Sequence, residues 1–251
     1  MEKSEHGLMR ALHFGPLEVF LCGGPDRQGG GKGPLVVLFH GYGAPGDDLV
    51  GIYRGLDVDR SFRFAFPKAP IVLEDALGLS RLGLEPPRAW WPVDVQALEE
   101  AILAGRHRDL SQSLPQGLRE AEALASKCLD ALEEALEPSH LVIGGFSQGA
   151  MLATSIALSS ERRLDGLVAW SGTYLNEAEW RLRMSKRKGL RAFVSHGKED
   201  PLLPFDAAER LAQDMTAAGW QVLFVPFRGQ HQIPGIVLDR FEKWLRELFA
   251  A

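Results

Sequence analysis

The chain has 251 residues, of which 45% are apolar and 24% charged. This size can bury the core of one α/β domain, and the composition excludes a disordered or fibrous protein. With 28 basic and 33 acidic side chains the formal charge is −5, which argues against a nucleic-acid partner.

The N-terminus and the cysteines indicate a cytoplasmic location. The first residues are charged and contain no apolar stretch, so we expect no signal peptide. No run of about 18 apolar residues occurs, so we expect no integral membrane association. Cys22 and Cys128 are too few for a disulfide framework and are typical of idle thiols in a reducing compartment.

Apolar runs alternate with amphipathic stretches along most of the chain. The first twenty-odd residues predict an antiparallel edge strand, which a glycine-rich loop at 23–33 follows. Buried strands are predicted at 35–39, 62–66, 141–143, 166–170, 192–195 and 221–225, and helices at 116–137, 150–159, 205–218 and 236–248. This alternation predicts an α/β fold, a mostly parallel twisted sheet with helices on both faces and an antiparallel N-terminal edge.

Residues 71–115 interrupt this alternation. The segment contains Pro86-Pro87 and Trp90-Trp91-Pro92 and predicts only short helices near 95–104 and 107–113. Long excursions of this kind in α/β domains are usually lids or pocket walls, so we expect a lid-like segment here with Trp90 and Trp91 lining a substrate pocket. No second domain boundary or repeat is visible, which predicts a single domain over 1–251.

A serine motif lies between a predicted strand and a predicted helix. Gly145-Phe146-Ser147-Gln148-Gly149 matches G-x-S-x-G, in which a tight turn exposes a serine hydroxyl and the glycines permit close backbone approach. The strand before it and the helix after it support Ser147 as a nucleophile, against the alternative of an incidental serine in a plain turn.

A serine nucleophile needs a histidine base and an orienting acid. Only His196 and His231 follow Ser147, and in this architecture the chain order is serine, acid, histidine. The loops after three strands would bring Ser147, Asp200 and His231 to one edge of the sheet. We expect His196 to be structural.

Other acids stay open as alternatives. Glu199 is one position from Asp200, and Glu177 and Glu179 lie on the correct edge but in a helix-like run. Asp206 and Asp239 are interpreted as charges on helices.

The oxyanion of an acyl-transfer reaction needs preformed donors. One is expected to be the backbone N–H of Gln148, and the other that of Tyr42, which lies in the glycine-rich turn His40-Gly41-Tyr42-Gly43 after a buried strand.

Two further features carry less weight. Gly29-Gly30-Gly31-Lys32-Gly33 fails the phosphate-loop pattern at both ends and precedes a strand. The basic residues between 181 and 191 could meet an anionic surface, but the net negative charge favours a solvated helix end and loop. No histidine or cysteine cluster has metal-ligand spacing, so we expect no metal and no cofactor.

The motifs together resemble those of a known family. The chain is similar to the α/β-hydrolase family of acyl-protein thioesterases, lysophospholipases and bacterial carboxylesterases, from about Leu35 to the C-terminus. The resemblance rests on His40-Gly41-x-Gly43, Phe66-Pro67-x-Ala69-Pro70, Gly144-Gly145-Phe146-Ser147-Gln148-Gly149-Ala150, His196-Gly197-x-x-Asp200 and Gly229-x-His231-x-Ile233.

This resemblance implies an α/β-hydrolase fold and a serine ester or thioester hydrolase. It implies Ser147 as nucleophile, Asp200 as acid, His231 as base, and backbone donors at Tyr42 and Gln148. Trp90 and Trp91 fall in a segment that borders the acyl site in the family. Tyr42 replaces an aliphatic residue common in thioesterases, and 96–116 is longer than in eukaryotic members, so the acyl specificity stays open.

We therefore expect a hydrolase of small-molecule carboxylic esters with short to medium acyl groups. The alternatives are a lysophospholipase or acyl-protein thioesterase, or a non-catalytic binding protein of the same fold. The oligomeric state is open, with a homodimer as one outcome.

Overall fold

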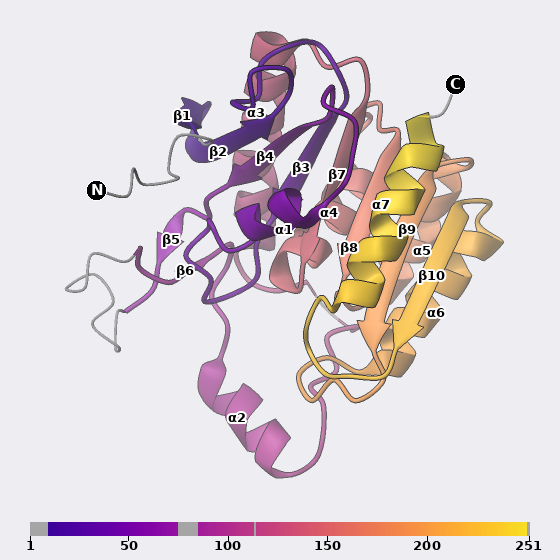
Figure 1. The fold of residues 1–251 in the computed structure, drawn as a ribbon. Coiled ribbons are helices and arrows are strands. Elements are labelled where there is room, and N and C mark those ends of the chain that lie inside the picture. The colour runs from indigo at the N-terminus through magenta and orange to yellow at the C-terminus, as the bar shows by residue number, and fades with distance from the viewer. Residues whose placement is uncertain (1–9, 75–84, 113, 250–251) are drawn as a thin grey trace.

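One mixed sheet forms the centre of the molecule (Figure 1). In the computed structural model, which describes residues 10–74, 85–112 and 114–249, eight strands follow the order β1-β2-β4-β3-β7-β8-β9-β10. Their bounds are β1 Arg10–Phe14, β2 Leu17–Gly23, β3 Leu35–Phe39, β4 Arg63–Pro67, β7 Leu141–Phe146, β8 Gly166–Trp170, β9 Arg191–Gly197 and β10 Gln221–Phe227. Neighbouring strands from β4 to β10 pair in parallel, whereas β1 with β2 and β2 with β4 pair antiparallel. The predicted fold class is confirmed.

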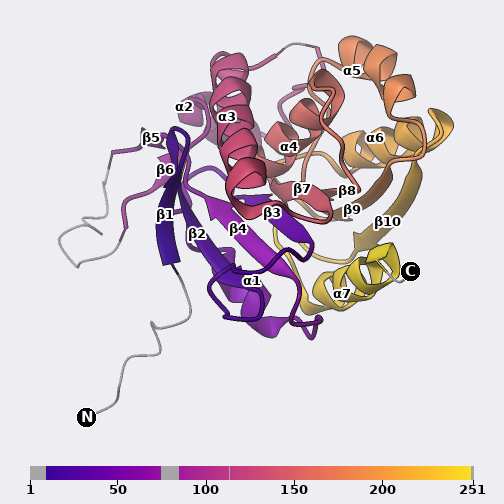
Figure 2. The ribbon, with the colours of Figure 1, turned by 90° about the horizontal axis from the view of Figure 1, so that it is seen from above.

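Helices cover both faces of this sheet. Figure 2 shows α3, α4, α5 and α6 on one side and α1 and α7 on the other, and a separate apolar cluster lies under each layer. The helix bounds are α1 Val50–Gly55, α2 Val95–Leu103, α3 Leu118–Leu136, α4 Gln148–Ser159, α5 Glu177–Met184, α6 Phe205–Ala217 and α7 Gly235–Phe249. Among the helices of the described ranges, none is long and apolar enough to cross a membrane.

The N-terminal edge contains more strand than the sequence predicts. Where we expected one strand, β1 and β2 form a hairpin that turns at Gly15, whose φ is 55°. A glycine at that turn accommodates the positive φ without a steric penalty. Residues 1–9 of the predicted strand lie outside the described residues.

Two predicted helices differ from the structure. The helix predicted from residue 116 begins at Leu118, because Gly117 has a φ of 86° and ends the preceding turn. The helix predicted at 107–113 is wrong over the described part, 107–112. There the Asp109 carboxylate accepts hydrogen bonds from both the N–H and the hydroxyl of Ser111, which stabilise a turn in place of a helix.

Arg63 lies fully buried at the start of β4. Its guanidinium donates to the carbonyls of Gly31, Leu136 and Gly33 at 2.5, 2.9 and 2.7 Å. In the sequence Arg63 interrupts an apolar strand. In the structure it connects the glycine-rich loop before β3 to the end of α3.

The carboxyl ends of the parallel strands meet at one edge of the sheet, which is the usual ligand edge of an open α/β sheet. The segment that contains the short β6 (Arg88–Ala89), which pairs with β5 (Ile71–Val72), continues into α2 beyond this edge (Figure 1). Within the predicted lid-like excursion at 71–115, residues 75–84 and 113 lie outside the described residues. Its role as a lid stays a prediction.

Candidate functional site

Ser147 lies in a tight turn between β7 and α4. Its backbone has φ 54° and ψ −115°, a region that residues other than glycine rarely occupy. The Ser147 N–H donates to Trp170 O at 2.9 Å, and Ser147 O accepts from Met151 N at 3.1 Å. These bonds hold the strained turn at the carboxyl edge of the sheet, where the half-buried side chain is presented.

The two outer glycines of the serine motif permit this turn to pack against the end of β3. A Cβ on Gly145 would lie 2.2 Å from Phe39 O, and one on Gly149 would lie 2.0 Å from the same oxygen. Both distances are shorter than any real contact, so no side chain fits at either position. The motif predicted from sequence therefore has its physical reason in this close approach.

Asp200 and His231 are joined by a hydrogen bond. The distance from His231 Nδ1 to Asp200 Oδ2 is 2.7 Å. The other carboxylate oxygen accepts from the N–H groups of Leu202 and Leu203 at 2.8 and 3.0 Å, which fix the carboxylate plane. The Phe146 ring, adjacent to Ser147, lies 4.8 Å from the His231 ring. The structure thus brings the acid and the histidine together beside the serine turn.

A close backbone contact places the His231 loop against the end of β9. A Cβ on Gly197 would lie 2.3 Å from Gln230 O and 2.5 Å from Gly229 O. Because Gly197 has no side chain, the loop can approach closely enough for His231 to reach Asp200.

His196 is a second histidine on the same carboxylate. It is fully buried, and its Nε2 lies 3.2 Å from Asp200 Oδ2 and 3.0 Å from Leu203 O. Both neighbours are acceptors, so Nε2 carries the proton. The expected structural role is consistent with this burial, but the contact with Asp200 was missed, because spacing alone does not say which way the ring turns.

The surroundings of Asp200 keep it ionised. Burial by itself would raise the pKa of Asp200, but hydrogen bonds from His196 and His231, the charge of His231 and the Leu203 N–H together lower it well below its usual range. A permanent carboxylate suits a group that orients an imidazole and stabilises its protonated form.

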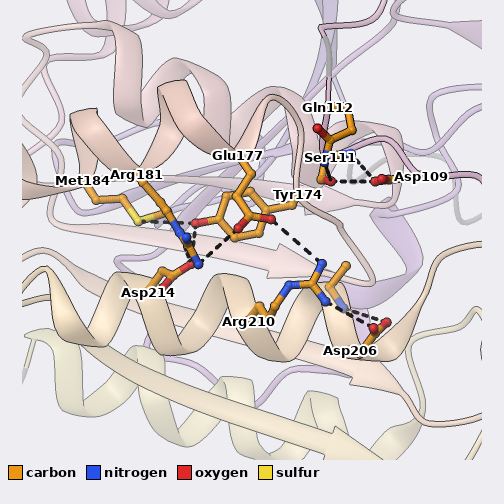
Figure 3. Close-up of polar contacts among 11 residues, drawn as sticks. Asp109, Ser111, Gln112, Tyr174, Glu177, Arg181, Met184, Asp206, Arg210 and Asp214 are labelled. Carbon is orange, nitrogen blue, oxygen red and sulfur yellow. Dashed lines mark hydrogen bonds and ion pairs between the residues drawn. The ribbon is translucent and has the colours of Figure 1, made fainter.

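The alternative acids are engaged elsewhere. Glu199 pairs with the exposed Arg228. Glu177 and Asp206 both lie beside Arg210, as Figure 3 shows between α5 and α6. The structure therefore brings Asp200, and none of these three, to His231.

The turn after β3 lies against the serine turn. A Cβ on Gly41 would lie 3.2 Å from the Phe146 ring and 3.5 Å from Ser147 Cβ. Within the described loops, no backbone hydrogen bond uses the N–H of Tyr42 or of Gln148. Both predicted oxyanion donors thus belong to segments that meet at Ser147, and their role stays a prediction.

His40 is buried behind this turn. Its Nε2 accepts from the backbone N–H of Ala69 at 3.0 Å, so the proton is on Nδ1, which donates to Gly41 O at 2.8 Å. Burial lowers the pKa of His40 to about 4, and the charges of Arg88 and Lys68 act in the same direction. His40 belongs to a motif that is visible in the sequence, but the motif does not predict a neutral imidazole.

Trp90 and Trp91 are 1% and 3% exposed and lie in the larger core cluster. The Gln148 side chain accepts from the Trp90 N–H at 2.9 Å and donates to Trp91 O at 2.8 Å. Contact of either ring with a substrate stays a prediction.

A serine–histidine hydrogen bond and a metal site are both absent from the described residues. No hydrogen bond of the described residues joins Ser147 Oγ to His231, so that contact stays a prediction. In the same part of the chain, no group of three or more His, Cys, Asp or Glu side chains could hold a metal ion.

The residues of the basic cluster mostly have partners. Arg181 pairs with Asp214 and Glu177 (Figure 3), and Arg183 pairs with Glu179. Arg187 donates to three backbone carbonyls. These contacts give most of the cluster a structural explanation.

Comparison with known proteins gives one family for most of the chain. A family model described as Phospholipase/Carboxylesterase matches residues 28–249. A relative named acyl-protein thioesterase 1, from Kluyveromyces lactis, is 28% identical over 176 residues, which are 68% of this chain and 71% of that protein. Another of the same name, from Emericella nidulans, is 23% identical over 86% of this chain and 90% of its own length.

Solved structures share the fold. The crystal structure of esterase PE8 has a TM-score of 0.73 and 24% identity and covers 91% of this chain and 97% of its own. A carboxylesterase from Mesorhizobium loti has a TM-score of 0.71 and 15% identity, with coverages of 95% and 98%.

Proposed function

The chain belongs to the phospholipase/carboxylesterase family, and from that premise we propose that it is a serine hydrolase that cleaves carboxylic esters of short to medium acyl length. The reaction is acyl transfer to water through an acyl-Ser147 intermediate. The substrates are small-molecule esters, and the alternative of a non-catalytic binding protein has no support in the family or in the site.

We assign the proposed catalytic roles as follows. Ser147 Oγ attacks the ester carbonyl carbon while His231 Nε2 accepts its proton. The C–O bond to the leaving group then breaks, and His231 returns the proton to the departing alcohol. Water repeats both steps on the acyl-serine and releases the acid. Asp200 holds His231 through Nδ1–H and stabilises the imidazolium.

The N–H groups of Tyr42 and Gln148 form the proposed oxyanion hole. Each removed donor in such a site typically costs about 10²–10³ in rate. Both groups adjoin the Ser147 turn and are unused by other backbone hydrogen bonds of the described loops.

One observation carries this proposal more than any other. The His231–Asp200 hydrogen bond of 2.7 Å lies beside a serine whose φ of 54° is that of a nucleophile turn. These three residues come from loops after β7, β9 and β10.

The test is Ser147→Ala with Ser195→Ala as its matched control. Ser195 Oγ is buried in β9 and has no hydrogen-bond partner among the residues that the structure describes, so its loss should leave hydrolysis of p-nitrophenyl esters unchanged. Ser147→Ala should abolish turnover and labelling by a fluorophosphonate while the circular dichroism spectrum stays native. Unchanged turnover in Ser147→Ala, or a label on another residue, overturns the assignment.

A second candidate is hydrolysis of thioesters, which the names of the curated relatives favour. The proposed chemistry is the same, with a thiol as leaving group. Matched oxygen and sulfur esters over a range of acyl lengths separate the two, and a lysophospholipase would be recognised by activity on lysophospholipid micelles. A cytoplasmic location and a homodimer stay predictions.

A further inference from the structure

Trp90 contacts both segments that carry the proposed oxyanion donors. We propose that Trp90 is a positioning residue that holds the N–H groups of Tyr42 and Gln148 in register with each other. This inference rests on the proposed function and gives Trp90 a role other than the expected wall of an acyl pocket.

The indole side of Trp90 holds the turn after β3. Its Nε1–H donates to His40 O at 3.0 Å, and its ring packs edge-on against Phe39, with centroids 5.1 Å apart and planes at 88°. The side chain is 1% exposed, so water does not compete with His40 O for the indole N–H. The start of the turn is thereby fixed to one rigid ring.

The His40 imidazole connects this fixed turn to the Tyr42 N–H. Its Nδ1–H donates to Gly41 O at 2.8 Å, and that carbonyl shares a peptide group with the Tyr42 N–H. Because a trans peptide is planar and directs its C=O and N–H oppositely, holding the oxygen sets the direction of the N–H. On the other side, the Gly43 N–H donates to Arg88 O at 2.8 Å.

The backbone side of Trp90 holds the second donor residue. Its N–H donates to Gln148 Oε1 at 2.9 Å, and Gln148 Nε2 donates to Trp91 O at 2.8 Å. These two bonds fix both the oxygen and the nitrogen of the Gln148 side-chain amide to the Trp90-Trp91 backbone. Gln148 is also the first residue of α4. The same residue that fixes the first donor segment also fixes the second.

This arrangement matters because two donors must meet a single oxygen. Each N–H must lie about 2.7–3.1 Å from the oxyanion, and the gain is largest when no reorganisation occurs during reaction. A link that fixes the relative position of the donors stabilises the transition state more than the bound ester, so its loss should lower kcat and leave KM nearly unchanged.

Trp90→Phe tests this directly. The variant keeps an aromatic ring beside Phe39 and removes the donor to His40 O. We expect kcat per active site to fall about tenfold with KM unchanged, and the inhibition constant of an alkyl boronic acid, which forms a tetrahedral adduct at the serine, to rise by a similar factor. Gln148→Met, which removes the other link but keeps the backbone donor, should act in the same direction.

Trp220→Phe is the matched control. Trp220 is also buried, at 3% exposure, and its Nε1–H donates to a backbone carbonyl, Met184 O, at 2.9 Å. It loses the same kind of core hydrogen bond in a part of the fold outside the site, so its kcat, KM and boronate inhibition should stay within about twofold of wild type.

Three results separate the explanations. If Trp90→Phe and Gln148→Met keep the wild-type kcat and boronate affinity, Trp90 only fills the core and the inference is wrong. If Trp220→Phe loses as much as Trp90→Phe, the effect is general destabilisation and the inference is equally wrong. If the wild-type protein hydrolyses no ester and takes up no fluorophosphonate, the proposed function itself fails.

Discussion

The neutral buried imidazole of His40 makes the stability of the protein depend on pH in a specific window. Its pKa falls from the ordinary 6.5 to about 4 on folding. Each pH unit between the folded and unfolded pKa corresponds to about 1.4 kcal/mol, so this histidine contributes ~3 kcal/mol that is present above pH 6.5. Between pH 6.5 and pH 4 the unfolded chain binds a proton that the folded chain does not, so the contribution is lost as the pH falls through that window.

Urea unfolding at pH 7.5 and pH 4.5 measures this contribution. We expect the wild-type protein to lose ~2–3 kcal/mol more unfolding free energy between the two pH values than His40→Gln, which cannot titrate. Carboxylates such as Asp200 titrate alike in both proteins, so their effect cancels in the difference. His13→Gln, which removes an exposed histidine on β1, serves as the control and should follow the wild type.

Parallel pH dependence in the wild type and His40→Gln would refute the reasoning. It would mean that the imidazole is not held neutral by burial. The assignment of its proton to Nδ1, and with it the fixed direction of the Gly41–Tyr42 peptide group, would then lose its basis.

Four more predictions concern packing and reactivity. Gly197→Ala should lower esterase activity about 10²-fold, because its Cβ would lie 2.3 Å from Gln230 O and displace the histidine loop. Gly51→Ala lies in helix α1, and apart from the chain next to it and the helix backbone, no heavy atom of the described residues lies within 4 Å of the new Cβ. It should raise the unfolding free energy by about 0.5–1 kcal/mol. Arg63→Met should lower it by about 2–4 kcal/mol in urea titration, since three carbonyls lose their donor; a smaller loss would mean that water replaces the guanidinium. Cys22 and Cys128 should not react with Ellman's reagent at pH 8 unless urea is added, because burial raises the pKa of both thiols to about 12.

The strands of the sheet could be predicted from sequence because burial on both faces leaves a simple signal. Leu35–Phe39 and Gly166–Trp170 are continuous apolar runs, and the structure has strands with these same bounds. The ends of helices are harder to predict, because the backbone conformation of a single residue such as Gly117 can set where a helix begins.

The side-chain contacts that organise the site could not be predicted in the same way. The order of residues in the chain indicates Asp200 and His231. The spacing does not show that His196 contacts the same carboxylate. It also does not show that the Gln148 side chain forms hydrogen bonds with the backbone of Trp90 and Trp91. These contacts depend on rotamers and on loops from distant parts of the chain. The turn at Asp109 was missed for a related reason, because a local carboxylate–hydroxyl bond outweighed a weak helical pattern.

The backbone conformation of Ser147 has a consequence for the free energy of unfolding. Conformations of this kind cost about 1–3 kcal/mol in residues that carry a Cβ, and at φ 54° and ψ −115° a glycine would adopt the turn with less penalty. The fold would therefore be more robust with its proposed nucleophile replaced by glycine. The position thus gives up unfolding free energy for the hydroxyl that the proposed reaction requires.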